Sequence, residues 1–280
     1  MPPSSTCTCT CTCKHVPPGI GIFDSGLGGL TVFHEIALNL PGEALIYFGD
    51  TARVPYGIKS EETVTRYAFE IAHFLMKKNI KALIVACNTA TAYALSALTD
   101  SFKIPVIGVI EPGITRALEV TKNQHIGIIG TEGTIRSGAY HRGLQQKNPK
   151  VKVISQACPL LVPLVEEGWF EDLETEAIVR RYLAPLVAAG VDTLILGCTH
   201  YPLLKKVIQR VVGSRVVLVD SAQEVARTIQ KTLKNQMCDP QTLPLPSHRF
   251  YVTDAPERFQ SVGRRFLGGE ALSEVEKIVL

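Results

Sequence analysis

Two cysteines in this 280-residue chain occur in the same kind of local setting. Cys87 follows the apolar run of residues 82–86, and Cys198 follows residues 194–196 and one glycine. Each apolar run has the length and composition of a buried strand, so each cysteine is expected at a strand end. The residues after the cysteines are polar: Asn88 and Thr89 in the first element, and Thr199 and His200 in the second.

Two thiols in equivalent places can act on one carbon atom from opposite faces. Inverting a stereocentre by proton transfer requires a base on one face and an acid on the other, and the two exchange roles in the reverse reaction. A thiolate and a thiol suit both roles, because free cysteine titrates near about 8.5 and each pKa unit of adjustment costs about 1.4 kcal/mol. The pattern therefore indicates a proton-transfer site served by Cys87 and Cys198.

The polar neighbours of the two cysteines differ. His200, two residues after Cys198, can stabilise a thiolate or relay its proton. Asp24, if it lies beside Cys87, would raise the pKa of that thiol by its charge and accept its proton as a relay. We therefore pair Cys198 with His200 and Cys87 with Asp24. The alternative for either cysteine alone is an inert buried residue, and the repeated context favours function.

The elements that would position these residues alternate between strands and helices, which predicts an α/β fold. Apolar runs without alternation are typical of parallel strands that are covered on both faces. Ser60 can cap a helix whose apolar face includes Val64, Tyr67, Ile71 and Leu75. The expected strands are residues 20–23, 45–48, 82–86, 105–110, 125–129, 194–196, 215–219 and 250–253. Further helices are expected at residues 30–39, 174–190 and 256–266, with a kink or an early break at Pro185.

The chain also contains an internal repeat. Residues 20–25 correspond to residues 126–131, and Cys87 corresponds to Cys198, at offsets of 106 and 111 residues. This predicts two pseudo-symmetric lobes, each with a mostly parallel sheet flanked by helices. Ligands of open α/β sheets bind beyond the carboxyl ends of the strands, so the active site is expected in the crevice between the lobes. The polar residues expected at these strand ends are Asp24, Asp50, Cys87, Thr131, Cys198 and Asp220.

Composition restricts the other classes of function. The 29 basic and 26 acidic side chains are dispersed and leave a net charge of +3, so we expect neither a nucleic-acid partner nor a membrane partner. No apolar run approaches the roughly 18 residues of a membrane span, and no signal peptide is evident, which predicts a cytoplasmic protein. Four of the eight cysteines lie within residues 7–13. We interpret all eight as reduced thiols and residues 1–18 as a disordered tail, with a metal clip as the alternative.

Two further polar motifs have simpler interpretations. The glycines of residues 26–29 do not have the spacing of a dinucleotide-binding loop, so a tight turn that presents backbone N–H groups to a carboxylate is the better interpretation. Asp50 and Glu111 are expected to cap or brace loops.

Four motifs, in order along the chain, closely resemble those of the glutamate racemases, within the cofactor-independent aspartate/glutamate racemase superfamily. They are FDSGLGGLT at residues 23–31, GDTARVPYG at 49–57, ACNTA at 86–90 and LGCTHYP at 196–202. The resemblance extends from about Ile20 to the C-terminus, and it does not include the Cys-Thr tail. It implies interconversion of L- and D-glutamate, which supplies D-glutamate for peptidoglycan, without a cofactor or a metal.

The resemblance also implies roles for individual residues. Cys87 and Cys198 would be the two proton donors and acceptors, acting on D- and L-glutamate respectively, with Asp24 and His200 assisting. Tyr56 and Gly57 would hold a carboxylate. The amino acid would be held by Asp24, Ser25, Asn88, Thr89, Thr199 and His200, with Pro55, Thr131 and Thr134 as second-rank candidates.

For the whole molecule, the resemblance implies discontinuous lobes and a homodimer that takes free glutamate. Residues 19–112 plus 221–280 would form the first lobe, and residues 113–220 the second.

Three alternatives stay open at this point. The substrate could be aspartate, because a few pocket groups set substrate length. The chain could be a Cys-His hydrolase or amidase that uses Cys198 as its nucleophile, in which case Cys87 would be dispensable. It could also be a non-catalytic binding protein, or a thiol-metal module built on residues 7–13.

Overall fold

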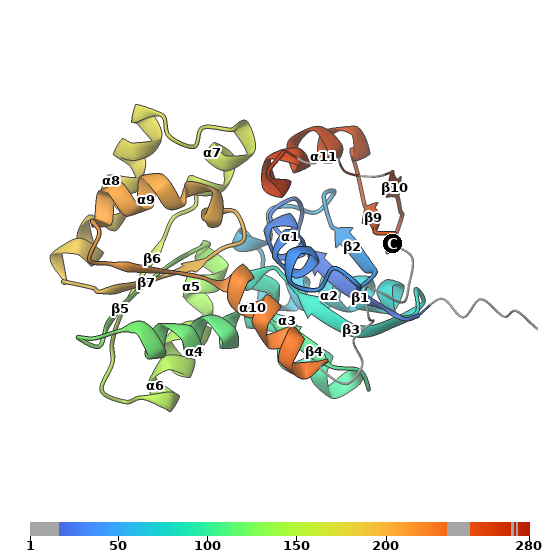
Figure 1. The fold of residues 1–280 in the computed structure, drawn as a ribbon, viewed down its shortest axis with the longest axis horizontal. Coiled ribbons are helices and arrows are strands. Elements are labelled where there is room, and N and C mark those ends of the chain that lie inside the picture. Colours follow the sequence, from blue (N-terminus) through green and yellow to red (C-terminus); the bar gives the residue numbers. More distant parts are fainter. Residues whose placement is uncertain (1–16, 234–246, 270–271, 273) are drawn as a thin grey trace, which may run out of the picture.

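The computed structural model describes residues 17–233, 247–269, 272 and 274–280. The fold has two parallel sheets, which lie side by side in Figure 1 with helices around each. The larger sheet has the strand order β10-β9-β2-β1-β3-β4, and the smaller has the order β6-β5-β7-β8. The expected α/β architecture with two sheets is confirmed.

The six-stranded sheet combines segments from both ends of the chain, because β9 and β10 pair beyond β2. All of its neighbouring strands are parallel. β1 and β2 are buried along their whole length, as their unbroken apolar sequences predict. The strands are β1 (Gly19–Asp24), β2 (Leu45–Gly49), β3 (Ile80–Val85), β4 (Val106–Gly108), β9 (Arg249–Val252) and β10 (Val275–Lys277).

Helices cover both faces of this sheet. Ile46 and Leu83 pack with residues of α2 and α3 on one face, and Ile22 and Tyr47 pack with residues of α1 and α11 on the other. Ser60 caps α2 by accepting a hydrogen bond from the Thr63 backbone N–H, as expected. The helical elements are α1 (Leu30–Asn39), η1 (Tyr56–Ile58), α2 (Glu61–Met76), α3 (Asn88–Ser101), α10 (Ser221–Thr232), α11 (Pro256–Gly263) and η3 (Arg264–Leu267).

The four-stranded sheet lies between α4 and α6 on one face and α8 and α9 on the other. Its strands are β5 (His125–Gly130), β6 (Lys152–Ala157), β7 (Thr193–Gly197) and β8 (Val217–Asp220). Its helical elements are α4 (Ile110–Val120), α5 (Glu132–Ser137), α6 (Ala139–Lys147), α7 (Leu161–Glu167), α8 (Leu173–Ala188), η2 (Tyr201–Leu204) and α9 (Lys205–Val212).

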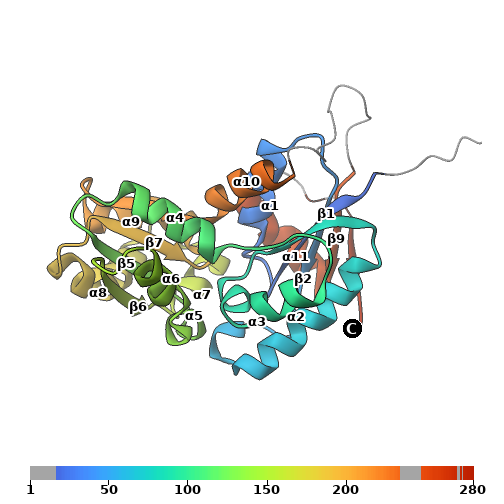
Figure 2. The ribbon, with the colours of Figure 1, turned by 90° about the horizontal axis from the view of Figure 1, so that it is seen from below.

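Helix α10 joins the two halves. It packs against α1 and α4, and Figure 2 shows it beside α1 at the junction. Its buried residues Val225 and Ile229 belong to an apolar cluster that continues through α1 and α8. We propose residues 19–112 with 221–280 as one lobe and residues 113–220 as the other.

Several element boundaries differ from those expected. The strand expected at residues 105–110 is only Val106–Gly108, and Ile110 begins α4, where Pro112 in the first turn suits a helix start. The early break at Pro185 is wrong, because α8 continues to Ala188. The last expected helix becomes the 3-10 turn η3 after Gly263. Strand β6 was not predicted, because its sequence KVISQA lacks an unbroken apolar run and its residues are only partly buried or exposed.

Residues 1–16 of the segment 1–18 that was interpreted as a disordered tail, which include the four cysteines of the metal-clip alternative, lie outside the described residues. In the parts of the chain that the structure describes, no helix is long and apolar enough to cross a membrane.

Candidate active site

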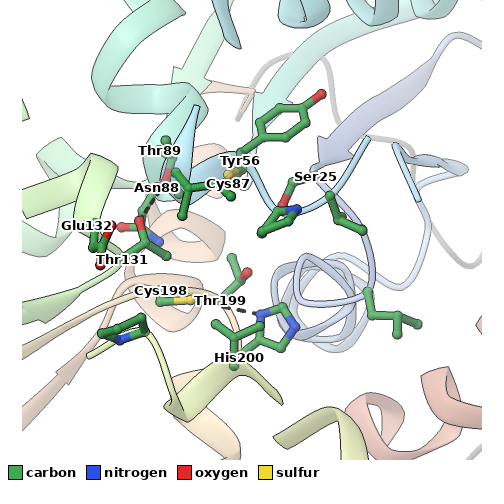
Figure 3. Close-up of a pocket in the computed structure, with 18 of the residues that line it drawn as sticks. Ser25, Tyr56, Cys87, Asn88, Thr89, Thr131, Glu132, Cys198, Thr199 and His200 are labelled. Carbon is green, nitrogen blue, oxygen red and sulfur yellow. Dashed lines mark hydrogen bonds between the residues drawn. The ribbon is translucent and has the colours of Figure 1, made fainter. Parts of the chain in front are cut away.

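A cavity of about 400 Å³ opens between the two sheets, at the carboxyl ends of β1, β3, β5 and β7. Both halves of the internal repeat contribute to its wall, as expected for a crevice between α/β lobes. Figure 3 shows the side chains that converge on it. The lining includes most of the predicted site residues: Ser25, Pro55, Tyr56, Gly57, Cys87, Asn88, Thr89, Thr131, Cys198, Thr199 and His200.

Cys87 precedes the first residue of helix α3. Its side chain makes no capping hydrogen bond to α3, but the backbone N–H groups of Thr89 and Ala90 and the Ser25 hydroxyl act to lower the pKa of the thiol. Burial raises the pKa of Cys87 to about 12, and the charge of Asp24 adds to this rise, while these three groups oppose it. The helix N-terminus therefore places amide donors near a thiol whose raised pKa keeps it protonated at neutral pH.

Cys198 lies directly after β7, in the position that corresponds to Cys87, but its surroundings differ from those of Cys87. Its Sγ lies 3.9 Å from Nδ1 of His200. Burial raises the pKa of Cys198, the backbone N–H of His200 opposes this, and the charges of Cys87 and Asp24 add to it. The predicted pair of Cys198 with His200 is therefore in contact in the structure.

The His200 ring is fixed on several sides. Its Nε2 lies 3.1 Å from Oε1 of Glu166, and the Phe266 ring packs edge-on against it with centroids 5.4 Å apart. A Cβ atom at Gly28 would lie 2.4 Å from Nδ1 of His200, so only glycine lets the start of α1 approach the ring this closely.

Asp24 is fully buried at the end of β1 and lies outside the cavity lining. Its carboxylate accepts hydrogen bonds from the Gly26 backbone N–H at 2.9 Å and from the Thr199 hydroxyl at 3.4 Å. Burial raises the pKa of Asp24, while His200 and these hydrogen bonds oppose the rise. Because Asp24 raises the pKa of both Cys87 and Cys198, it acts electrostatically on both thiols.

Three threonine hydroxyls form a cluster where the two halves meet. Thr89 Oγ1 lies 2.8 Å from Thr131 Oγ1 and 3.1 Å from Thr134 Oγ1, and the last two are 3.0 Å apart. Gly57 approaches the same cluster, since a Cβ there would lie 2.7 Å from Thr131 Cβ. The hydrogen bonds of the cluster therefore join α3 to the start of α5, and η1 packs against Thr131. Thr89 and Thr131 both line the cavity.

The Tyr56 hydroxyl points away from the cavity in Figure 3 and donates to Asp50 at 2.5 Å. Asp50 also accepts hydrogen bonds from Arg53 and Thr253, which confirms the expectation that it braces a loop. The Tyr56 hydroxyl is therefore held by Asp50 and does not point into the cavity. Glu111, the other expected brace, forms an ion pair with Lys147.

The sequence did not predict Glu166, Phe266 or Tyr140. Glu166 lies 34 residues before His200, on α7, and reaches it only through the fold. Tyr140 donates to Oδ1 of Asn88 at 2.7 Å and so fixes that amide. Only spatial proximity identifies these residues, because no local motif connects them with the cysteines. Among the described residues, no group of three or more His, Cys, Asp or Glu is arranged to hold a metal ion.

Residues 25–229 match the sequence model of the Asp/Glu/hydantoin racemase family. The chain belongs to this family. It is 56% identical to the glutamate racemase of Geobacter metallireducens over 261 residues, which cover 93% of this chain and 96% of that protein. All the cavity-lining residues of this family member lie within the matched stretch.

Solved structures of relatives have the same fold. Glutamate racemase isoform RacE1 from Bacillus anthracis has a TM-score of 0.90 and 43% identity, with 94% of this chain and 98% of that chain covered. Glutamate racemase from Francisella tularensis, solved in complex with D-glutamate, has a TM-score of 0.86 and 38% identity, with 94% and 97% covered.

Proposed function

We propose that this chain is an isomerase that interconverts L- and D-glutamate by proton transfer at Cα between Cys87 and Cys198. The observation that carries the proposal is the position of the two thiols. They line one cavity from the ends of β3 and β7, in different sheets, and Figure 3 shows a space between them. The solved relative that contains D-glutamate supports the choice of substrate.

In the proposed reaction, the thiolate on one face removes the α-proton, and the electron pair of the C–H bond remains on the α-carbon and its carboxylate. The thiol on the opposite face then gives its proton to the same carbon and becomes the thiolate. The reverse reaction exchanges these roles, so each turnover leaves the enzyme ready for the other enantiomer. No atom or electron is gained or lost overall.

Because the pKa values of the Cys87 and Cys198 thiols are raised, we propose that the bound amino acid helps to form the reactive thiolate. Burial raises the pKa of both thiols, that of Cys87 to about 12, so both are protonated at neutral pH. An α-ammonium group beside them would stabilise a thiolate, because an opposite charge at close range lowers a thiol pKa. We infer that the reactive thiolate forms when the amino acid binds, and that its proton passes to His200, 3.9 Å from the sulfur of Cys198, or to Asp24 on the side of Cys87.

The two carboxylates of glutamate have candidate partners at separate places in the cavity. One set is the backbone of Tyr56 and Gly57, near Pro55. We propose that the rest of the amino acid is held by polar groups that line the cavity: Ser25, Asn88, Thr89, Thr199 and His200. Asp24 would act through its charge. Thr131 and Thr134 are second-rank candidates. We further propose a cytoplasmic homodimer that uses no cofactor and supplies D-glutamate for peptidoglycan.

Racemisation of pure L- or D-glutamate by the purified protein in D₂O tests the proposal. With EDTA present and no pyridoxal phosphate added, the opposite enantiomer should form with deuterium at Cα. A reaction that EDTA abolishes, or that requires added pyridoxal phosphate, would contradict it. The same assay with aspartate tests the choice of substrate, and faster racemisation of aspartate would overturn it.

A Cys-His hydrolase is the second candidate, and one observation favours it. Cys198, His200 and Glu166 are arranged in the order thiol, imidazole and carboxylate that cysteine hydrolases use. This reaction would leave Cys87 without a role and would form a covalent acyl-enzyme on Cys198. Mass spectrometry of the protein mixed with glutamine or glutamate esters distinguishes the two, since the racemase should show no adduct.

A further inference from the structure

Tyr140 is buried on α6, outside the cavity lining, and connects the two cysteine elements. Its hydroxyl donates at 2.7 Å to Oδ1 of Asn88, the residue after Cys87. Its ring packs against Gly197, the residue before Cys198, where a Cβ atom would lie 3.2 Å from Cε2 of the ring. We propose that Tyr140 is a positioning residue that turns the N–H groups of the Asn88 amide toward the cavity, where they bind a carboxylate of the amino acid. This inference rests on the proposed function.

The inventory of donors and acceptors determines which end of the amide faces Tyr140. A tyrosine hydroxyl has one proton, and here the Asn88 oxygen accepts it, so the Ser221 hydroxyl at 3.1 Å must donate to the Tyr140 oxygen. Burial raises the pKa of Tyr140, so the phenol keeps its proton at neutral pH. Within the described part of the chain, the bond to Tyr140 is the only hydrogen bond of the Asn88 side chain. Both N–H donors of the amide are therefore available to a ligand.

The three side chains of this hydrogen-bond chain come from different parts of the fold. Asn88 begins α3, Tyr140 lies in the first turn of α6, and Ser221 begins α10 at the junction of the two halves. All three are buried, so solvent competes little for their hydrogen bonds. The phenol therefore holds the amide in one orientation relative to both sheets.

The position of Asn88 suits an anion close to the reacting carbon. Asn88 lines the cavity directly after Cys87, and Figure 3 shows it on the Cys87 side of the site. It is the first residue of α3, where the helix dipole favours negative charge. Amide N–H groups turned to the cavity donate to a carboxylate, whereas the amide oxygen in their place would repel it. The Tyr140 hydroxyl thus determines whether this position attracts or repels the anion.

Tyr140→Phe removes the hydroxyl and keeps the buried ring. The Asn88 amide can then rotate, so KM for both enantiomers should rise about fivefold to thirtyfold, the factor that one hydrogen bond of ordinary strength supplies. We expect kcat to stay within about threefold, because the carboxylate is charged before and after proton transfer and the lost contact weakens both states. The primary deuterium isotope effects on kcat, measured with 2-deuterated L- and D-glutamate, should not change.

Tyr201→Phe is the matched control. Tyr201 is also buried, and its hydroxyl donates at 2.9 Å to the backbone carbonyl of Cys158, outside the cavity lining. Each variant loses one buried hydrogen bond to a carbonyl oxygen, so both should lower the thermal unfolding midpoint by similar amounts. Only Tyr140→Phe should raise KM by more than about twofold. An equal rise of KM in Tyr201→Phe would show that general loosening of the fold is the cause and would overturn the proposal.

A double-mutant cycle with Asn88→Ala separates positioning from packing. If Tyr140 acts through the Asn88 amide, adding Tyr140→Phe to Asn88→Ala should change KM by less than about twofold. The proposal is wrong if the two increases of KM multiply, or if Tyr140→Phe keeps KM within about twofold, lowers kcat alone or increases either isotope effect. A wild-type protein that does not racemise glutamate would refute the proposed function instead, so the two failures can be told apart.

Discussion

Cys87 and Cys198 occupy equivalent positions in two different sheets, yet different groups surround their thiols. Cys87 lies at the N-terminus of α3, a helix of 14 residues, where the N–H groups of Thr89 and Ala90 act to lower the pKa of the thiol. Cys198 is followed by the short 3-10 helix η2, and its sulfur faces the ring of His200. Fixed amide dipoles therefore favour the thiolate of Cys87, whereas an ionisable side chain faces the sulfur of Cys198.

The difference shows what a duplicated fold determines and what it leaves variable. The parallel strands β3 and β7 both place a cysteine at the carboxyl end of a sheet, so the repeat gives the thiols equivalent positions. Tuning of the pKa depends on the next few residues and on distant contacts such as that of Glu166, which the repeat does not copy. The thiols are thus equivalent in position and unequal in their local chemistry.

Removing either thiol should have the largest effect. Cys87→Ser and Cys198→Ser should each lower net racemisation by roughly a hundredfold to ten-thousandfold, because an alcohol is a far weaker acid and one competent group cannot serve both faces. Circular dichroism of glutamate solutions measures the rate from either enantiomer. Near wild-type turnover in either variant would show that one thiol suffices and would contradict the assignment of one thiol to each face of the α-carbon.

Replacing His200 should have a smaller and directional effect. His200→Asn removes the group that faces Cys198 but leaves the amides around Cys87, so we expect kcat to fall about tenfold to a hundredfold. The primary isotope effect should increase for L-glutamate only. His141→Asn, an exposed position on α6, is the control and should change neither quantity.

If His200→Asn raised the isotope effects of both enantiomers equally, the imidazole would serve the whole site. The two thiols would then share one relay, and the contrast between an amide-stabilised and an imidazole-supported cysteine would be wrong.

Neutralising Asp24 should shift a titration. The charge of Asp24 raises the pKa of Cys87, so Asp24→Asn should lower that pKa, and the thiolate should appear at lower pH than in the parent protein. The rate of alkylation of Cys87 by iodoacetamide against pH measures it, followed by mass spectrometry of the peptide that contains Cys87, because the chain has eight cysteines. Asp100→Asn, exposed on α3, is the control. An unchanged or higher midpoint in Asp24→Asn would contradict the electrostatic role.

The smallest effect on activity is expected at Cys158. This thiol is fully buried and lies outside the cavity lining, and its Sγ contacts the Gln156 carbonyl oxygen at 3.6 Å. Cys158→Ala should keep kcat within about twofold and lower the free energy of unfolding by about 1 kcal/mol, through the small cavity that it leaves. Urea denaturation and the racemisation assay measure the two quantities. A large loss of kcat would add a third thiol to the comparison.

Sequence patterns predicted the parts of this fold that depend on local signals. Unbroken apolar runs identified β1, β2, β5 and β7, and the polar residues after them identified most of the cavity lining. Strand β6 was missed because a partly exposed edge strand needs no continuous apolar run. The end of β4 was misplaced because the apolar residues Val109 and Ile110 serve a helix start as well as a strand.

The site was predictable where one side chain follows another along the chain, as His200 follows Cys198. It was not predictable where the partner comes from a remote element. Glu166, Arg258 and Phe266 meet around His200 only because α7 and the C-terminal segment pack together. The orientation of the Tyr56 hydroxyl toward Asp50 likewise depends on tertiary packing.

The most direct test of the central claim follows deuterium in the substrate and the product during the first few per cent of conversion in D₂O. Two thiols on opposite faces predict that the product carries deuterium at Cα while the remaining substrate retains protium, starting from either enantiomer. A product that retains the original proton, or a substrate that gains deuterium as fast as the product forms, would show that a single group serves both faces and would contradict the account.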